Sequence, residues 1–233
     1  MIRVLTLVLF FLLRVSAGQA GPAFDFSDDF SRGAGGWETT SFPWEARDGA
    51  YVCESPEGGF SLPPADRVPP AGTVRAQAKV KILGTLSKSW KSAGIALYQD
   101  DKNYWKFSVV QGPDVAGQEP RRFAELRQML DGFWGAEREG QNILERIDGP
   151  QNFPPPVSDN PFLLVLELDS QEIRGRVMDS TGSALLWQQA WKFASGKAIV
   201  TSGRPALACG GFKALFDDVH FEGHDLRPVR TPS

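Results

Sequence analysis

The chain has 233 residues, a formal net charge of −3, 42% hydrophobic residues, two cysteines and two histidines. A mildly acidic chain without a basic cluster is a poor partner for nucleic acid or an anionic membrane surface, so we expect neither. Both histidines lie close to the C-terminus. A catalytic triad that depends on histidine is therefore not expected.

The first segment has the composition of a secretory leader. Arg3 supplies a positive start, and residues 4–13 form an apolar run too short to span a bilayer comfortably. Small residues follow within 15–20, where signal peptidase could cut. We predict a signal peptide over 1–20 and a secreted, periplasmic or cell-envelope protein with no membrane span after cleavage; a retained N-terminal anchor is the alternative. Cleavage removes two arginines and no acid, which changes the charge from −3 to 23 − 28 = −5.

Behind the leader, short stretches that alternate apolar and polar residues predict strands, and almost nothing is typical of a helix. The clearest alternation covers 74–83 and indicates a half-buried strand with one wet face. Residues 93–98 and 104–110, joined by a polar turn at 100–103, predict a β-hairpin. Further strands are expected at 50–54, 162–168, 173–178, 185–191, 205–209 and 215–221.

Residues 123–130 fit two local structures. As a strand they place Phe123, Glu125 and Arg127 on one face, but their composition also favours a short helix. About a dozen short strands at this spacing predict an all-β fold, a two-sheet antiparallel β-sandwich or jelly roll. We expect one such domain over 21–226, followed by a C-terminal tail over 227–233.

Several short motifs occur in a suggestive order. Asp-Asp-Phe at 28–30 opens the series and Phe-Asp-Asp-Val at 216–219 closes it. Between them lie Gly36-Trp37, Asp48-Gly49, Ala93-Gly94-Ile95, Asn103-Tyr104, Glu125-Leu126-Arg127 and Gly211-Phe212. In this order the motifs resemble the concanavalin A-like lectin/glucanase sandwiches. The resemblance covers essentially the whole mature chain, and it implies a sandwich whose first and last strands meet and a glycan or polysaccharide as partner. The Glu-x-Asp-x-x-Glu strand of the glucanases in that superfamily is missing, which argues against their mechanism.

Aromatic residues beside turns are the strongest binding signal. Sugar rings present apolar C–H faces to flat side chains, and their hydroxyls need forked polar partners. We therefore predict that the ligand contacts Tyr104, Trp105, Glu125, Arg127 and Trp134. Trp134 is the preferred candidate because glycines flank it in a polar segment. The alternative is that these rings fill the core, as most aromatic residues in a sandwich do.

Two other functions remain open. A glycoside hydrolase or polysaccharide lyase of this fold could use Glu125 and Asp131 as acid and base, with carboxyl groups about 5–5.5 Å or 6.5–9.5 Å apart. The competing interpretation is a solvated strand with a Glu125–Arg127 ion pair. A structural or adhesive envelope domain would instead fill the sugar-binding face with the segment 141–156.

Four aspartates would come together if the first and last strands pair: Asp28, Asp29, Asp217 and Asp218. Carboxylate oxygens suit Ca²⁺, and several sandwiches of the superfamily hold calcium near their termini, so structural Ca²⁺ is the candidate cofactor. The alternative is that these acids discourage edge-to-edge aggregation. Cys53 and Cys209 are the only candidates for a disulfide, and two separate buried thiols are the alternative.

Overall fold

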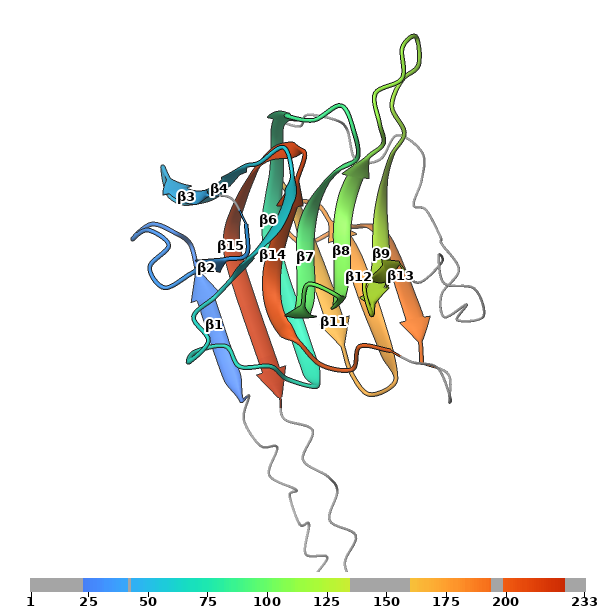
Figure 1. The fold of residues 1–233 in the computed structure, drawn as a ribbon. Coiled ribbons are helices and arrows are strands. Elements are labelled where there is room, and N and C mark those ends of the chain that lie inside the picture. The colour runs from blue at the N-terminus through green and yellow to red at the C-terminus, as the bar shows by residue number, and fades with distance from the viewer. Residues whose placement is uncertain (1–22, 42, 135–159, 194–198, 225–233) are drawn as a thin grey trace, which may run out of the picture.

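The computed structural model describes residues 23–41, 43–134, 160–193 and 199–224, which form two antiparallel β-sheets packed face to face (Figure 1). This confirms the predicted all-β two-sheet sandwich. The predicted signal peptide and C-terminal tail lie outside the described residues. Within these ranges no helix is long and apolar enough to cross a membrane. The strands are β1 (Phe24–Asp28), β2 (Glu38–Thr39), β3 (Trp44–Arg47), β4 (Ala50–Glu54), β5 (Gly58–Leu62), β6 (Thr73–Thr85), β7 (Lys91–Asp100), β8 (Asn103–Gln111), β9 (Arg122–Leu130), β10 (Phe133–Trp134), β11 (Phe162–Leu168), β12 (Glu172–Met178), β13 (Leu185–Lys192), β14 (Arg204–Gly210) and β15 (Phe212–His224).

The eight-stranded sheet is built around β6 and β15. Its order is β13-β12-β11-β6-β15-β4-β3, and β1 pairs with the C-terminal part of β15. Along β6 the predicted alternation holds, with Val74 and Ala76 buried and Arg75 half-buried between them. Asp28 of β1 stands opposite Val219 of β15. The first and last strands therefore pair, as expected from the motifs at 28–30 and 216–219.

The seven-stranded sheet has the order β10-β9-β8-β7-β14-β5-β2. The predicted hairpin is β7–β8, and β9 pairs with β8 from Gln111↔Arg122 to Tyr104↔Met129. Residues 122–130 are thus a strand, and the helical alternative was wrong. Pairing along its whole length overrides the helix propensity of this segment. Residues directly opposite each other on two strands project from the same face, and this arrangement builds the site described below.

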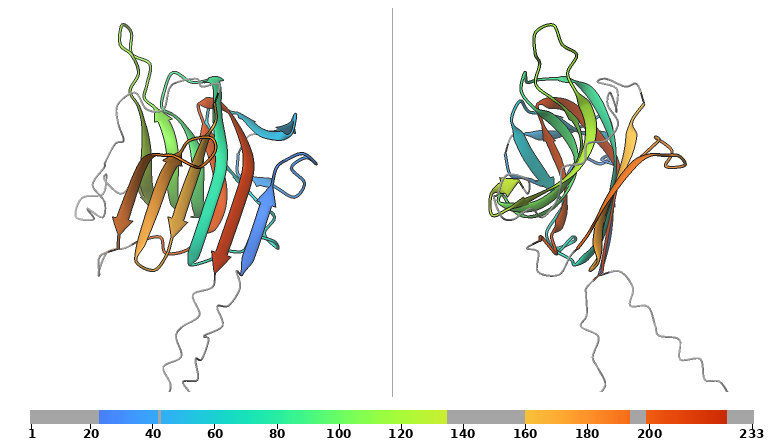
Figure 2. Two further views of the ribbon diagram at one scale, coloured as in Figure 1. Left: turned by 180° about the vertical axis from the view of Figure 1, so that it is seen from behind. Right: turned by 90° about the vertical axis from the view of Figure 1, so that its right-hand side faces the viewer.

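The two sheets enclose one apolar core, and Figure 2 shows the two layers from the side. Phe107 of β8 is fully buried there and stacks on Trp187 of β13, with ring centroids 6.1 Å apart. Its ring also approaches β12 at Gly175, where an added Cβ would lie 2.4 Å from a ring carbon. A larger residue at Gly175 would therefore force the sheets apart.

The two cysteines lie on different sheets, Cys53 on β4 and Cys209 on β14. Both are buried free thiols, and the Cys209 thiol donates a hydrogen bond to the Phe212 carbonyl at 3.6 Å. Burial is the main cause that raises the pKa of the Cys209 thiol, whereas the neighbouring Cys209 side chain lowers the pKa of Cys53. In this structure both cysteines are therefore free thiols rather than a disulfide, and their side chains lie next to each other across the sandwich.

Candidate ligand-binding site

The outer face of the seven-stranded sheet carries most of the residues that the sequence marked for binding. Ala124 and Leu126 of β9 point into the core, so Glu125 and Arg127 point outward. On β8 the same alternation sends Lys106 outward, directly opposite Arg127. The structure therefore places Glu125, Arg127 and Lys106 on one face.

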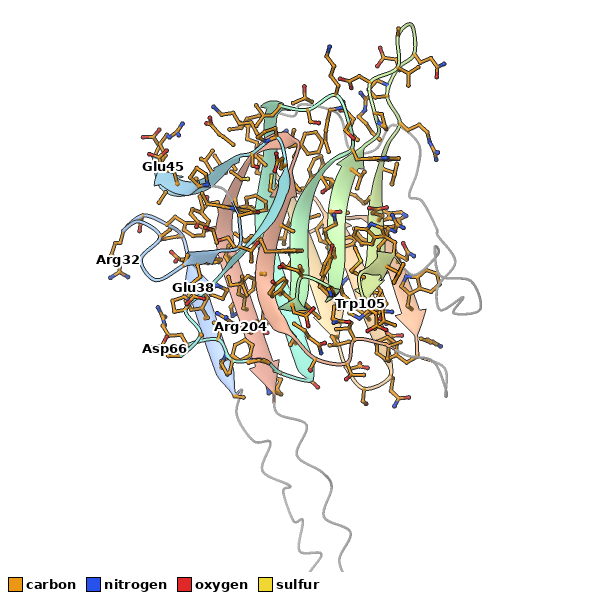
Figure 3. The ribbon with its side chains drawn as sticks, in the orientation of Figure 1. Arg32, Glu38, Glu45, Asp66, Trp105 and Arg204 are labelled. Carbon is orange, nitrogen blue, oxygen red and sulfur yellow. The ribbon has the colours of Figure 1, made fainter. Side chains whose placement is uncertain are left out.

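Trp105 is a correction to the predicted site. It lies on the core side of β8 with no exposed surface, and its indole Nε1 donates a hydrogen bond of 2.9 Å to the Val200 carbonyl (labelled in Figure 3). Its neighbour Tyr104 faces outward but is only 8% exposed. Adjacent residues on a strand project from opposite faces, so the pair could not both contact one ligand.

A two-residue turn brings Trp134 to the outer face. Asp131 and Gly132 have φ of 52° and 84°, values that suit the tight turn of a hairpin, and they connect β9 to β10. The Asp131 and Gly132 N–H groups donate to Asn103 Oδ1 and to the Lys102 carbonyl, at 3.0 and 2.9 Å. The turn is thereby anchored to the β7–β8 turn. In the resulting register Trp134 pairs with Met129 and lies on the same face as Arg127.

Four aromatic rings form a row across this face. Trp134 meets Tyr104 edge to face at 5.8 Å, Tyr104 meets Phe60 of β5 at 4.8 Å, and Phe60 meets Tyr98 of β7 at 4.9 Å. Burial is the largest cause that raises the pKa of Tyr104, to about 12, so its hydroxyl stays protonated at neutral pH. The row supplies flat apolar surface over strands from three parts of the chain.

Two adjoining hollows open on the same face. The Trp134 hollow has a volume of about 390 Å³, and its lining includes Trp134, Arg127, Glu125, Lys106 and Ser92. The Phe60 hollow has a volume of about 360 Å³ and is lined by Phe60, Tyr104, Thr40 and Asp101 among others. Lys106 and Ser92 line both, and Lys106 Nζ donates to Ser92 Oγ at 3.3 Å. This bond forms the boundary between the two hollows.

Glu125 is the most unusual group in the Trp134 hollow. Its side chain belongs to a residue that is only 7% exposed, yet among the described residues its carboxylate has no hydrogen bond or ion pair. The alternative Glu125–Arg127 ion pair does not form. Beside it on β8, the Ser108 hydroxyl is fully buried and also lacks a partner in the described part of the chain. Glu125 lines the Trp134 hollow and Ser108 does not, so a ligand in this hollow can reach the Glu125 carboxylate and gain affinity by bonding to it.

Lys106 completes the polar part of the hollow. Burial is the main cause that lowers the pKa of its ammonium, and the nearby Glu125 carboxylate acts in the opposite direction. Both Lys106 and Arg127 lie over the Trp134 ring, with Nζ 5.3 Å and Cζ 4.5 Å from the ring centroid. These cation–π contacts fix the two positive groups at one end of the aromatic row.

The predicted acid–base pair does not form. Asp131 is exposed in the β9–β10 turn, six residues beyond Glu125 on an extended strand, which corresponds to a separation of roughly 20 Å. A two-carboxylate glycosidase needs a much shorter distance. Among the described residues that line the Trp134 hollow, Glu125 is the one carboxylate. The pairing of Glu125 with Asp131 was therefore wrong.

Asp28, Asp29 and Asp218 line one hollow of about 370 Å³, so the aspartates of the first and last strands lie near each other, but they do not form a close set of calcium ligands. Asp28 accepts hydrogen bonds from the Phe30 N–H at 2.9 Å and the Trp37 indole at 2.8 Å, and Asp29 accepts from Ser31. Asp218 pairs with Lys79 at 2.5 Å. Within the described residues no three of these four carboxylates converge, and the one convergent set of three is Asp25, His220 and Glu222. These carboxylates close turns and bind a lysine.

Sequence reasoning missed several residues of the site, among them Lys106, Ser92 and Phe60. Lys106 was detectable, because it is a charged residue at an outward position of a strand that was correctly predicted. Ser92 was undetectable as a binding residue, since one serine among small residues is not informative. Phe60 lies on β5, which begins with two glycines and shows no alternation long enough to predict a strand.

No family model matches the chain, and no curated protein matches its sequence. Solved structures do share the fold. The carbohydrate-binding module CBM66 from Bacillus subtilis aligns with a TM-score of 0.53 and 13% identity over 81% of this chain and 96% of that one. The CBM2 module of the Lactobacillus casei BL23 phage J-1 evolved Dit aligns with 0.55 and 11% identity, over 87% and 96%. A mutant of the GH43 protein BlXynB from Bacillus licheniformis gives 0.56 and 13% over 85% of this chain but only 39% of its own length. At these identities the likeness shows the two-sheet sandwich fold.

Proposed function

We propose that the chain is an exported carbohydrate-binding β-sandwich module of the concanavalin A-like type, which holds a glycan on the outer face of its seven-stranded sheet. Two of the similar structures carry the names of carbohydrate-binding modules, which supports a carbohydrate-related function. The aromatic row would stack against sugar rings, and Glu125, Arg127 and Lys106 would bond to their substituents.

One observation supports this proposal most strongly. Glu125, a residue only 7% exposed whose carboxylate forms no hydrogen bond or ion pair with the described residues, lines the hollow beside the half-exposed ring of Trp134. A stable fold would normally pair such a carboxylate. A sugar supplies hydroxyl donors for Glu125 and a C–H face for Trp134 at the same time. The Asp131-Gly132 turn, anchored on the β7–β8 turn, holds the indole in place before binding.

The test combines a glycan array with Trp134→Ala. We expect the exported protein to retain a defined group of glycans without cleaving them. Trp134→Ala should weaken that binding about tenfold or more, since loss of one aromatic contact costs roughly 1–3 kcal/mol. Isothermal titration calorimetry on the best array ligand measures the change.

Phe133→Ala is the matched control. Phe133 precedes Trp134 on the same hairpin strand but projects from the other side, so its removal deletes an aromatic ring without touching the hollow. Phe133→Ala should leave the affinity within about twofold of the wild type. If Trp134→Ala binds as tightly as Phe133→Ala while both remain folded, Trp134 is not part of the site. If no glycan binds, the proposed function fails; the structural-domain alternative rests on residues 141–156, which lie outside the described residues.

A further inference from the structure

The positive groups around Trp134 differ from the other cations of the sheet. Lys91, which lines the hollow, bonds to Asp114 at 2.7 Å, and Arg204 of β14 lies 3.9 Å from Glu38. Arg127 and Lys106, in contrast, form no ion pair with any carboxylate of the described residues. They hold adjacent positions on β9 and β8 and share the ring of one tryptophan.

The charges in the Trp134 hollow do not balance. Among its described lining residues, Lys91 is neutralised by Asp114, while Glu125 offsets one of the two remaining cations. One positive charge is left. The Asp101 carboxylate lines the Phe60 hollow and accepts a hydrogen bond from the Tyr98 hydroxyl at 2.7 Å. The excess is therefore located at the Trp134 end of the site.

This arrangement favours an anionic substituent on the ligand. Two like charges held side by side repel each other, and the half-buried Lys106 ammonium has only the Ser92 hydroxyl as a hydrogen-bond partner. A planar carboxylate can accept two parallel hydrogen bonds from the Arg127 fork and lie near Lys106 as well. A neutral sugar hydroxyl can accept a hydrogen bond from either group, but it brings no negative charge to offset the two cations.

We propose that the glycan is acidic, and that the sugar bound at Trp134 is a uronic acid whose carboxylate is held by Arg127 and Lys106. This inference rests on the proposed glycan-binding function and names its ligand class. Glu125 then accepts hydroxyl hydrogen bonds on the same residue, and the acidic sugar brings the negative charge that the hollow lacks. Sulfate esters share the negative charge but have a tetrahedral rather than a planar shape.

The test uses pairs of probes that differ only in charge. Calorimetry on the full chain purified after export compares oligogalacturonate, alginate and hyaluronan oligosaccharides with their carboxyl methyl esters. For the best-bound uronate we expect the acid to bind at least tenfold more tightly than its ester at low salt. The advantage should shrink as sodium chloride is added, because screening weakens the charge interaction.

Variants assign the discrimination to residues. Arg127→Gln should reduce the acid-to-ester ratio to within about threefold of unity, and Arg127→Lys should retain part of it because the charge remains without the fork. Glu125→Gln removes the competing carboxylate, so it should raise rather than lower the ratio. Thermal unfolding confirms that each variant is folded, and Lys106→Gln provides the second measurement if Arg127→Gln unfolds.

The outcomes separate the two proposals. Equal binding of acid and ester, or binding of neutral glycans alone, overturns the acidic ligand but leaves the glycan-binding function intact. Selective binding of sulfated oligosaccharides with no affinity for uronates overturns the carboxylate assignment. An unchanged ratio in both Arg127→Gln and Lys106→Gln removes these cations from recognition. Absence of binding to every glycan overturns both proposals.

Discussion

The two outer faces of the sandwich differ in how their charged side chains are paired. On the eight-stranded sheet, cations of neighbouring strands are bonded to carboxylates: Arg75 and Arg176 to Glu167, Arg174 to Glu172, Lys79 to Asp218 and Lys213 to Glu54. On the seven-stranded sheet, Glu125, Lys106 and Arg127 lie in a hollow without such partners in the described part of the chain. Exposed ion pairs contribute only about 0–1 kcal/mol each and mainly keep a sheet soluble. Charges without partners beside aromatic rings are therefore the better sign of a binding face.

The largest effect concerns the connection between the two sheets. Because the buried Cys53 and Cys209 thiols are close enough to shift each other's pKa, we predict that an oxidising compartment joins them in a disulfide. The bond would close a loop that spans most of the chain and stabilise the fold by roughly 4–5 kcal/mol, less any strain. Both faces should then unfold together and lose stability together on reduction.

Intact mass spectrometry after alkylation in denaturant tests this prediction, followed by urea unfolding with and without reductant. The Cys53→Ala/Cys209→Ala double variant is the control, since its stability should not respond to reductant. Two alkylated thiols in the exported protein would contradict the prediction. Binding at Trp134 should change little in either case, because neither cysteine lines the Trp134 hollow, although Cys209 lines the Phe60 hollow.

The next effect tests whether the close approach of β7 and β8 requires a residue without a side chain at position 94. Gly94 of β7 stands opposite Ser108, and an added Cβ would lie 2.0 Å from the Phe107 carbonyl oxygen and 2.6 Å from the Ser108 Cα. Those atoms belong to backbone and cannot rotate away. We expect Gly94→Ala to lower the free energy of unfolding by about 1–3 kcal/mol or more, as overpacking does.

Gly84→Ala is the matched control on the eight-stranded sheet. No atom lies within 4 Å of the position of an added Cβ at Gly84 of β6. Its stability should stay within about 0.5 kcal/mol of the wild type in urea unfolding. Equal stabilities of the two variants would show that β7 and β8 can move apart at this position, and that the close approach at Gly94 does not limit the residue there.

The sequence predicted most of the framework but only part of the site. Alternation located β6, the β7–β8 hairpin and β9, since each has one face in the core and one in water. The same alternation correctly put Glu125 and Arg127 on one face. The two-residue strand β10 and the glycine-rich β5 were not predicted, because so short or irregular a segment has no period to detect.

Distances explain the remaining differences. Composition cannot reveal that Asp131 ends a strand far from Glu125, nor that the aspartates of 28–29 and 217–218 have separate partners. Trp105 lies near a turn, which suggested a binding role, but it is two residues from Phe107 on the same strand and therefore points into the core with it. Parity along a predicted strand would have selected Lys106 in its place.

The smallest effect concerns a carboxylate on the eight-stranded sheet that has no ion pair among the described residues. Asp217 lies opposite Lys79 on its outer face, yet it has no ion pair among the described residues and accepts only the Asp218 N–H, at 2.7 Å. Burial is the main cause that raises the pKa of Asp217 above its ordinary value of 3.8, and the charge of Asp218 adds to the shift. At a pH above the pKa of Asp217 in the folded protein, the ionised carboxylate therefore slightly destabilises the fold.

Asp217→Asn should therefore stabilise the fold, by an amount that depends on pH. A carboxyl whose pKa is raised by folding costs stability when it is ionised, and the cost disappears below the unfolded pKa, where both states are protonated. The variant should thus unfold at a slightly higher temperature than the wild type at pH 7 and at the same temperature near pH 3. Asp179→Asn provides the opposite sign, since hydrogen bonds from Ala184 and Ser183 lower the pKa of Asp179 and its ionised form favours folding. It should be destabilised at pH 7, with the difference fading as the pH falls. If Asp217→Asn keeps its advantage at pH 3, ionisation is not the cause, and Asp217 does not differ from the paired charges around it.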